Sequence, residues 1–412
     1  MMFKRKLIAT ALVTMGLSSF AHAETITMWV RSGSGGGAFQ AVIDAYNANG
    51  SDKVQLTVIP TEQMVQKYAT AVAGGQAPDA ISLDMVYTPA FAAAGELEDV
   101  TGFATALPYF KALAPAHVKA GTYEARVYGL PLLVETSLFV WNKELYKQAG
   151  LDPEKAPSSW EEITANAEKI NALGDGNSGF YFSGGCGGCM IFTFGPLTWG
   201  AGADILSEDA KTATLDTPQM RKAVDYYRKM VSSGAVAASA ATDTGVDFLK
   251  FVGGKIGQQS FGAFGIGQLI TQHPQIEFGV TQIPSVDGTP TSFAGGDNII
   301  ISKGTPRVGN IQKFLEFVYS EEGQRIMAEN GSLPTRTDIA EKVLEGKDPR
   351  ILVAANAIKV AKTPYTVQFN DLINSPNSPW SIFVNSAIFG DDVDGAIETG
   401  QLDMQSIIDS AQ

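Results

Sequence analysis

The stretch over residues 128–146 constrains the fold of this chain most, because two β-favouring apolar segments flank a short polar interruption. The apolar segments cover residues 127–134 and 138–141, and the sequence Glu-Thr-Ser at 135–137 separates them. Burial of a carboxylate between such segments is costly unless the carboxylate has a partner. We therefore expect a strand system that crosses between two lobes, with Glu135 at an interface or cleft. A surface turn at Glu135 is the alternative.

A repeated β-α-β order precedes this crossing. The apolar patterns predict strands over residues 25–30, 54–59 and 80–83, separated by helices that begin near residues 38 and 64. This order predicts a parallel, doubly wound sheet, in which binding sites lie at the carboxyl ends of the strands. The residues that fall at these ends are Trp29, Arg31, Asp84 and Tyr87.

A second α/β lobe is expected after the crossing, because a chain of 412 residues exceeds what one hydrophobic core usually serves. Ser158 and Glu161 fit a capping box for a helix from Trp160 to Ile170. Another helix is expected to begin at Pro218. Further strands are predicted at 180–182, 276–283 and 298–302, and further helices at 310–319, 321–330, 339–344, 352–361 and 395–408.

Residues 1–23 have the pattern of a secretory signal peptide, with basic residues 4–6, an apolar run over 7–17 and small residues ending at Ala23. The apolar run is shorter than the roughly 20 residues that a membrane span needs. We expect cleavage after Ala23 and a protein that is soluble in the periplasm. The formal net charge of −13 argues against nucleic acid or an anionic membrane as a partner.

The sequence contains two cysteines, Cys186 and Cys189, with two glycines between them. An oxidising compartment favours a disulfide between such close neighbours, and the glycines permit a tight turn. A redox-active pair would need a helix N-terminus of the thioredoxin type, and a metal site would need two more ligands. We therefore expect a local disulfide.

Catalytic motifs are not recognisable in this sequence. After the leader the histidines are His117 and His273, and neither lies in a nucleophile motif or at a metal-ligand spacing. The glycine-rich residues 32–37 lack the Lys-Ser/Thr ending of a P-loop and the dinucleotide fingerprint. We expect no enzymatic activity, no metal and no cofactor. A secreted carbohydrate-active enzyme with paired carboxylates is the alternative.

Aromatic residues near predicted strand ends favour a carbohydrate ligand. A sugar ring has an apolar C–H face that packs on an aromatic plane, and its hydroxyls bind carboxylate, amide or guanidinium groups. For each aromatic residue taken alone, burial in the core is the alternative. The aromatic candidates are Trp29, Tyr87, Trp199 and Phe264.

Several segments occur together in a characteristic order: PDAISLDMVYTPAFAAAGELEDV, YGLPLLVETSLFVWNKELYKQAGLDP, FVGGKIGQQSFGAFGIGQL, FAGGDNIIISKGT, FLEFVYSEEGQ and SLPTRTD. In this order they resemble the extracellular solute-binding proteins of carbohydrate ABC transporters, of the family 1 type. The resemblance covers nearly the whole chain after the leader. It implies a two-lobed periplasmic-binding-protein fold of the second type, in which each lobe is a mostly parallel sheet flanked by helices and hinge crossings join the lobes.

The resemblance also implies lobe boundaries and site positions. Lobe 1 would comprise residues 24–134 and 285–335, and lobe 2 would comprise residues 135–284 and 336–412. Phe264 stands where many family members carry Trp. The other positions implied for the ligand site are Trp29 or Arg31, Asp84, Glu135, Trp199, Gly296 and Asp297.

The implied function is the periplasmic substrate-binding component of an ABC transporter. Its lobes would close on a monosaccharide, oligosaccharide, amino sugar or polyol and deliver it to the membrane permease. The expected partners are this ligand and the permease subunits, with no nucleic acid, and the protein is expected to be a monomer. An amino sugar would gain charge-assisted hydrogen bonds from Asp84, Glu135 and Asp297, whereas a neutral sugar would offer them only hydroxyls.

Overall fold

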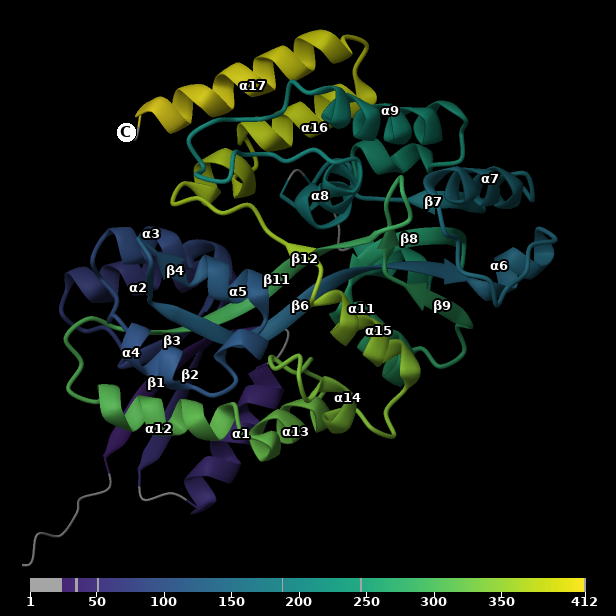
Figure 1. Cartoon of the computed structure of the whole chain (residues 1–412). Helices are drawn as coiled ribbons and strands as arrows, with labels where there is room; N and C mark the ends of the chain where they lie inside the picture. The colour runs from purple at the N-terminus through teal and green to yellow at the C-terminus, as the bar shows by residue number, and fades with distance from the viewer. Residues whose placement is uncertain (1–23, 34–35, 50–51, 187, 245–246, 411–412) are drawn as a thin grey trace, which may run out of the picture.

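A computed structural model of the chain describes residues 24–33, 36–49, 52–186, 188–244 and 247–410 (Figure 1). The expected leader, residues 1–23, lies outside this described part. The fold is two-lobed and of mixed α/β type, and the longest sheet has the strand order β2-β1-β3-β11-β6-β8-β7.

The first three strands form the parallel start that the β-α-β order predicts. Strand β1 (Thr25–Arg31) lies between β2 (Lys53–Ile59) and β3 (Ala80–Asp84), and both pairings are parallel. Helices α1 (Gly36–Asn49) and α2 (Thr61–Ala73) connect these strands. The inward side chains of β1 alternate with exposed ones, so one face of the strand supplies core residues. Arg31 and Asp84 are the last residues of β1 and β3, and each lies one residue beyond the predicted strand.

Two long antiparallel strands carry the chain through the middle of the molecule. Strand β6 (Gly129–Asn142) is continuous through Glu135, which excludes a surface turn there. Strand β11 (Pro290–Ile301) pairs with β6 and also with β3, in both cases antiparallel. The strand predicted at 298–302 is therefore only the end of a longer one. Because β6 and β11 pair antiparallel with their neighbours, the sheet is mixed at its centre and parallel among β1, β2 and β3.

The far end of β6 enters a second group of strands. It pairs antiparallel with β8 (Ile256–Gly262) and with β9 (Phe278–Thr281). Strand β7 (Ser178–Tyr181) pairs parallel with β8. Figure 1 shows helices α7 (Trp160–Asn171), α8 (Met190–Gly200), α9 (Pro218–Ser232), α16 (Pro379–Phe389) and α17 (Val393–Ser410) on this side of the molecule.

Helix α7 begins at Trp160 as predicted, but its N-cap is Ser159 rather than Ser158, so the capping box is shifted by one residue. The hydroxyl of Ser159 accepts a hydrogen bond from the Glu162 amide, and the Glu162 carboxylate accepts one from the Ser158 amide. The predicted helix at Pro218 is confirmed, with Thr217 as its N-cap. Helices α8 and α16 were not predicted, because apolar residues are spread around both helices and no amphipathic stripe marks them.

The remaining elements complete the chain between these landmarks. They are α3 (Thr88–Ala93), α4 (Thr101–Ala106), α5 (Pro115–Ala120), β4 (Thr122–Tyr123), β5 (Arg126–Val127), α6 (Lys143–Gln148), α10 (Asp247–Val252), α11 (Ala263–Gln272), β10 (Ile283–Pro284), α12 (Val308–Val318), α13 (Glu321–Glu329), α14 (Ala340–Val343), α15 (Pro349–Ala357) and β12 (Ala361–Lys362).

The buried apolar residues divide along β11. Phe293 and Ala294 pack in the core cluster that contains β7, β8 and α16, whereas Ile299 and Ile301 pack in the cluster built on β1 and α12. The segment between them, residues 295–298, is where the chain passes from one core to the other. Within the described ranges, no helix is both long enough and apolar enough to cross a membrane.

Candidate functional site

A cavity of about 210 Å³ lies against the middle of the paired strands β6 and β11. Its polar wall comes from the ends of β1 and β3 and from the middle of β6, and its apolar wall comes mainly from phenylalanine side chains. The lining residues are Arg31, Asp84, Val86, Glu135, Thr136, Ser137, Ile191, Phe192, Gly262, Phe264, Phe293, Gly295, Gly296, Phe369 and Asn374.

Arg31 is anchored by a buried carboxylate beneath the cavity. Its Nε donates to Asp297 Oδ1 at 2.6 Å, and its Nη2 lies 2.5 Å from the same oxygen. Ser82 Oγ donates to Asp297 Oδ2 at 2.7 Å, and the Asp297 side chain is 0% exposed. Burial by itself lowers the pKa of Arg31, but Asp297 and Asp84 outweigh this effect and hold the pKa above its usual value. The guanidinium is therefore a fixed cation.

Asp84, at the end of β3, is the third charged residue of the cluster with Arg31 and Asp297. Its Oδ2 lies 3.4 Å from Arg31 Nη1, and in the sheet register Asp84 is the direct partner of Asp297. Burial raises the pKa of Asp84 to about 6. The charge of Arg31 lowers this pKa, and the nearby carboxylate of Asp297 raises it. The side chain keeps 32% exposure, so Asp84 can present a carboxylate to a bound molecule.

Glu135 projects into the cavity from the middle of β6. Its Oε2 accepts a hydrogen bond of 3.1 Å from the backbone amide of Phe264, at the start of α11. Burial raises the pKa of Glu135 to about 7, and this effect exceeds the lowering by the Phe264 amide and by Arg31. Among the described residues, this carboxylate therefore has one hydrogen-bond donor, a backbone amide on one of its two oxygens.

Gly296 allows the two crossing strands to approach each other. Its φ is +104°, a conformation that favours glycine, and a Cβ atom there would lie 2.0 Å from the carbonyl oxygen of Leu133. Gly262 makes room in a similar way, because an added Cβ would lie 2.7 Å from the Phe264 ring. Both glycines line the cavity.

Four phenylalanines line the cavity, and the sequence identified only Phe264. Phe192 and Phe293 are in edge-to-face contact with ring centroids 4.8 Å apart, and Phe192 is 40% exposed. Phe369 lies in a loop before residues 370–374. No local pattern marked these three residues, because α8, the first half of β11 and the loop near Phe369 meet only in the folded chain.

Asn374 was also not identified from the sequence. Its Nδ2 donates to the Tyr87 hydroxyl at 2.9 Å, which joins the segment after β3 to the C-terminal part of the chain. Both residues line a wider cavity of about 850 Å³ that shares Arg31, Asp84 and Phe369 with the central one. Tyr87 therefore lies at the mouth of the site.

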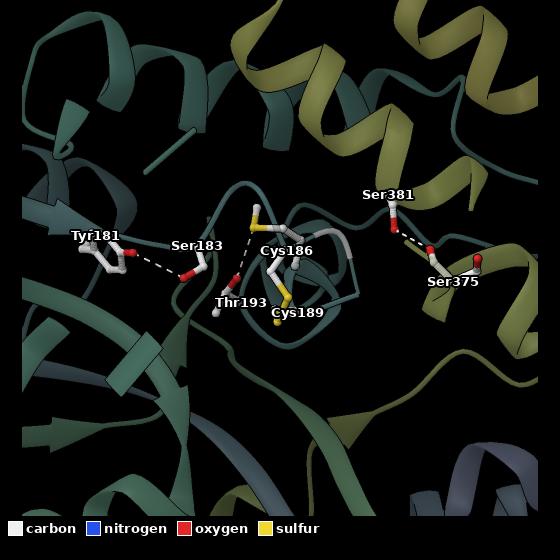
Figure 2. The surroundings of a disulfide bond; sticks show 8 residues. Tyr181, Ser183, Cys186, Cys189, Thr193, Ser375 and Ser381 are labelled. Carbon is white, nitrogen blue, oxygen red and sulfur yellow. Dashed lines mark hydrogen bonds between the residues drawn. A yellow bond between two sulfur atoms is a disulfide. The ribbon is translucent and has the colours of Figure 1, made fainter. Parts of the chain in front are cut away.

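A disulfide between Cys186 and Cys189, as expected from the sequence, precedes helix α8 (Figure 2). Helix α8 begins at Met190, and its second and third residues, Ile191 and Phe192, line the cavity. A Cβ at Gly188 would lie 3.1 Å from the carbonyl oxygen of Asn374, so the disulfide loop packs against the segment that carries Asn374. The disulfide thus fixes the start of a wall of the site.

Four predicted site residues do not line the central cavity, and two of these, Trp29 and Trp199, have their contacts elsewhere. Trp29 packs against the core cluster near α2, with Lys67 Nζ 5.4 Å from its ring centroid. Trp199 is 7% exposed, stacks on Phe293 and donates through Nε1 to Asp204 Oδ1 at 3.2 Å. The structure brings together Arg31, Asp84, Glu135, Phe264 and Gly296 at the cavity, Asp297 beneath it and Tyr87 at its mouth.

The arrangement is suited to binding a polar solute with an apolar face. Carboxylates, a guanidinium and an amide stand on one side, and aromatic rings stand on the other. In the described part of the chain, no group of three or more His, Cys, Asp or Glu side chains is arranged to hold a metal ion.

Sequence and structure comparisons identify proteins that are similar to this chain. A relative from Brucella abortus (strain 2308), whose name specifies a binding protein without a solute, is 26% identical over 341 residues, which cover 81% of this chain and 82% of the relative. The diacetylchitobiose binding protein DasA of Streptomyces coelicolor is 23% identical over 369 residues, which cover 86% and 83% of the two chains.

The crystal structure of the cyclic alpha-maltosyl-1,6-maltose binding protein from Arthrobacter globiformis superposes with a TM-score of 0.82. The alignment covers 94% of this chain and 100% of that protein at 24% identity, which supports the fold. The profile of the bacterial extracellular solute-binding proteins matches residues 32–325. Together with the two-lobed fold and the cavity at its crossing, this match shows that the chain belongs to the family of bacterial extracellular solute-binding proteins.

Proposed function

We propose that this protein binds a carbohydrate or polyol in the central cavity and delivers it to the permease of an ABC transporter. The observation that carries the proposal is the cavity at the β6–β11 crossing, where Asp84, Glu135 and Arg31 face phenylalanine rings. Sugar hydroxyls would bind the charged groups, and the C–H face of a sugar ring would pack on the aromatic rings. The names of DasA and of the Arthrobacter protein specify saccharide ligands, which supports the same ligand class.

The two lobes are proposed to close around the ligand. We assign residues 24–134 and 285–335 to lobe 1 and residues 135–284 and 336–412 to lobe 2, so that the first boundary falls within β6 and the second falls shortly before β11. A ligand that touches both lobes stabilises the closed arrangement by the contacts that it makes only there. The hydrogen bond between Tyr87 and Asn374 supports this assignment, because it joins the two proposed lobes at the mouth of the cavity.

The proposed ligand-contacting residues are those that line the central cavity or its mouth. Arg31 is held by Asp297, so Asp297 acts as a positioning residue rather than a contact. Four further residues are proposed as ligand contacts because they line the central cavity: Phe192, Phe293, Phe369 and Asn374. Trp29 and Trp199 are proposed as core residues, because they are engaged outside the cavity.

The protein is proposed to act in the periplasm as a monomer, after cleavage of a signal peptide behind Ala23. The extracellular character of the family supports this location. Its members are binding proteins, so a secreted carbohydrate-active enzyme is not proposed.

A ligand screen tests the proposal. The purified protein is titrated with mono- and disaccharides and hexitols while thermal unfolding and the radius of gyration in solution are followed. Binding is expected to raise the unfolding temperature, because the ligand stabilises only the folded state, and to reduce the radius of gyration as the lobes close. A complete absence of both changes with every saccharide and polyol would contradict the proposed function.

A further inference from the structure

Acidic side chains dominate the walls of both connected cavities. Among the residues that line the central cavity and its mouth, Arg31 is the one Lys or Arg residue. The carboxylates on the same walls belong to Glu62, Asp84, Glu96, Glu135 and Asp371. An excess of negative charge in a cleft attracts cationic molecules and repels anionic ones. This lining argues against a phosphorylated or carboxylated solute.

Arg31 does not offset this excess, because its charge is already paired. Two of its nitrogens are directed at the buried carboxylate of Asp297, and the third lies 3.4 Å from Asp84. Asp297 is fully buried and belongs to the same ion pair, so the pair as a whole contributes little net charge to the cavity. The carboxylates of Asp84 and Glu135 remain on the wall of the cavity.

Glu135 is a cavity carboxylate that has no ion-pair partner among the described residues. Its single hydrogen bond comes from the Phe264 amide, and no Lys or Arg nitrogen of the described residues forms an ion pair with it. A buried carboxylate without a cationic partner is destabilised relative to its protonated form, which agrees with the rise in the pKa of Glu135 to about 7. A ligand ammonium group at this position would restore the charge balance.

Aromatic rings stand beside this carboxylate. The backbone amide of Phe264 binds Glu135, and the Phe264 ring lines the cavity. Phe192 and Phe293 form an edge-to-face pair on the same cavity. Phenyl rings accept no conventional hydrogen bonds, but their faces attract cations and pack on C–H groups. The combination of an unpaired carboxylate and aromatic faces fits a cationic nitrogen attached to a carbon skeleton.

We infer that the solute is a cationic amino sugar or amino polyol, whose ammonium group binds Glu135 while its carbon face packs on the phenylalanine rings. This inference rests on the proposed function and specifies its ligand class. It places the ammonium at the crossing strand β6, where a contact also reaches α11 through the Phe264 amide.

Matched ligands test the inference by isothermal titration at low salt. The three sets are glucose, glucosamine and N-acetylglucosamine; cellobiose, chitobiose and diacetylchitobiose; and sorbitol with N-methylglucamine. In at least one set the amine should bind about tenfold or more tightly than its neutral counterparts, because hydrogen bonds to charged groups are stronger than neutral ones. If some ligands bind, and in every set with measurable binding a neutral ligand binds as tightly as the amine, the inference is overturned. The proposed function is unaffected by that result. No binding by any member overturns both.

The variant Glu135→Gln keeps the size of the side chain and removes its charge. It should lose about tenfold or more in affinity for the amine and little for the neutral ligands. The matched control is Glu398→Gln on the exposed face of α17, which should leave every affinity unchanged. An equal loss for amine and neutral ligands in Glu135→Gln would contradict the inference.

The wild-type protein provides a second test that does not depend on the folding of a variant. The secondary amine of N-methylglucamine remains protonated between about pH 5 and 8, because aliphatic amines titrate near 10. Its affinity should fall as the pH is lowered through about 7, where Glu135 becomes protonated, and sorbitol should show no such fall. A pH-independent affinity for N-methylglucamine would overturn the inference.

Discussion

Arg31 and Asp297, which are 266 positions apart in the sequence, form the ion pair beneath the solute cavity, with Arg31 Nε 2.6 Å from Asp297 Oδ1. The pair joins the end of β1 to the segment of β11 that passes between the two cores. It fixes a guanidinium at the cavity wall by means of a carboxylate that solvent does not reach. The geometry of the site therefore depends on the meeting of the first and the eleventh strand.

Replacement of Asp297 by alanine should destabilise the protein by about 3–5 kcal/mol, because it leaves the Arg31 charge without its buried partner. Urea unfolding followed by circular dichroism measures the loss. The control is Glu329→Ala, which breaks the half-exposed ion pair with Arg325 on α13 and should cost less than about 1 kcal/mol. Equal stability of the two variants would show that the buried ion pair does not stabilise the contact between β1 and β11.

Gly296→Ala should be destabilising by about 1–3 kcal/mol from backbone strain, with a further cost from the contact with the Leu133 carbonyl oxygen. Gly267→Ala provides the matched comparison, because Gly267 lies within α11 and an added Cβ there has open space. That substitution should stabilise the protein by up to about 1 kcal/mol, since alanine is the better helix former. Thermal unfolding of both variants measures the contrast, and a stable Gly296→Ala protein would contradict the close approach of the strands.

His117 should make the protein less stable in mild acid. It lies on α5, and burial lowers the pKa of His117 to about 4, more than the backbone groups of Leu133 and Gly295 raise it. Below about pH 6.5 the unfolded chain binds a proton at His117 that the folded protein excludes, so stability falls between about pH 6.5 and 4. This single group should cost about 2 kcal/mol at about pH 5.

The variant His117→Leu isolates that contribution, because leucine does not titrate. Asp84 and Glu135 act in the opposite direction, since their raised folded pKa values favour the folded state as the pH falls. The comparison is therefore the difference in unfolding free energy between variant and wild type at several pH values. That difference should change in favour of the variant from about pH 7 to pH 5, and a constant difference would contradict the buried neutral histidine.

The hydrogen bond between Asn374 and Tyr87 should favour the closed arrangement of the proposed lobes. Tyr87→Phe and Asn374→Ala should each weaken solute binding a few-fold, because one hydrogen bond contributes about 0.5–1.5 kcal/mol. Titration with the tightest ligand of the saccharide panel measures the loss. The double variant should lose no more than either single variant if the residues act through this shared contact, whereas additive losses would show that they act independently.

Local patterns in the sequence were informative wherever the structure depends on neighbouring residues. The strands that end in Arg31 and Asp84, the helix that begins at Pro218 and the position of Glu135 within a strand crossing were all predicted. Charged residues at strand ends stand out because they interrupt apolar alternation. The disulfide was expected for a similar reason, since Cys186 and Cys189 are close in the sequence.

Local sequence patterns did not predict helix α8 or three of the four phenylalanine residues that line the cavity. Helix α8 buries all of its residues except Phe192 and contains Pro196, so it has neither an amphipathic stripe nor the usual helix composition. Trp29 lies two residues before the strand end, where the chain packs against it and Lys67 covers its ring, so proximity to a strand end did not place it in the cavity.

The sequence by itself determined the α/β class, the strand segments within residues 128–146 and the charged residues at the strand ends, because each depends on periodicity or on motifs within a short segment. The expectation of two lobes came from the chain length and from the family resemblance. Only the tertiary structure decided which aromatic rings face those charges. Phe192, Phe293 and Phe369 come from segments far apart in the chain, and an apolar residue has the same local pattern whether it faces a core or a cavity. Long-range strand pairing between β6 and β11 brings them together with Glu135.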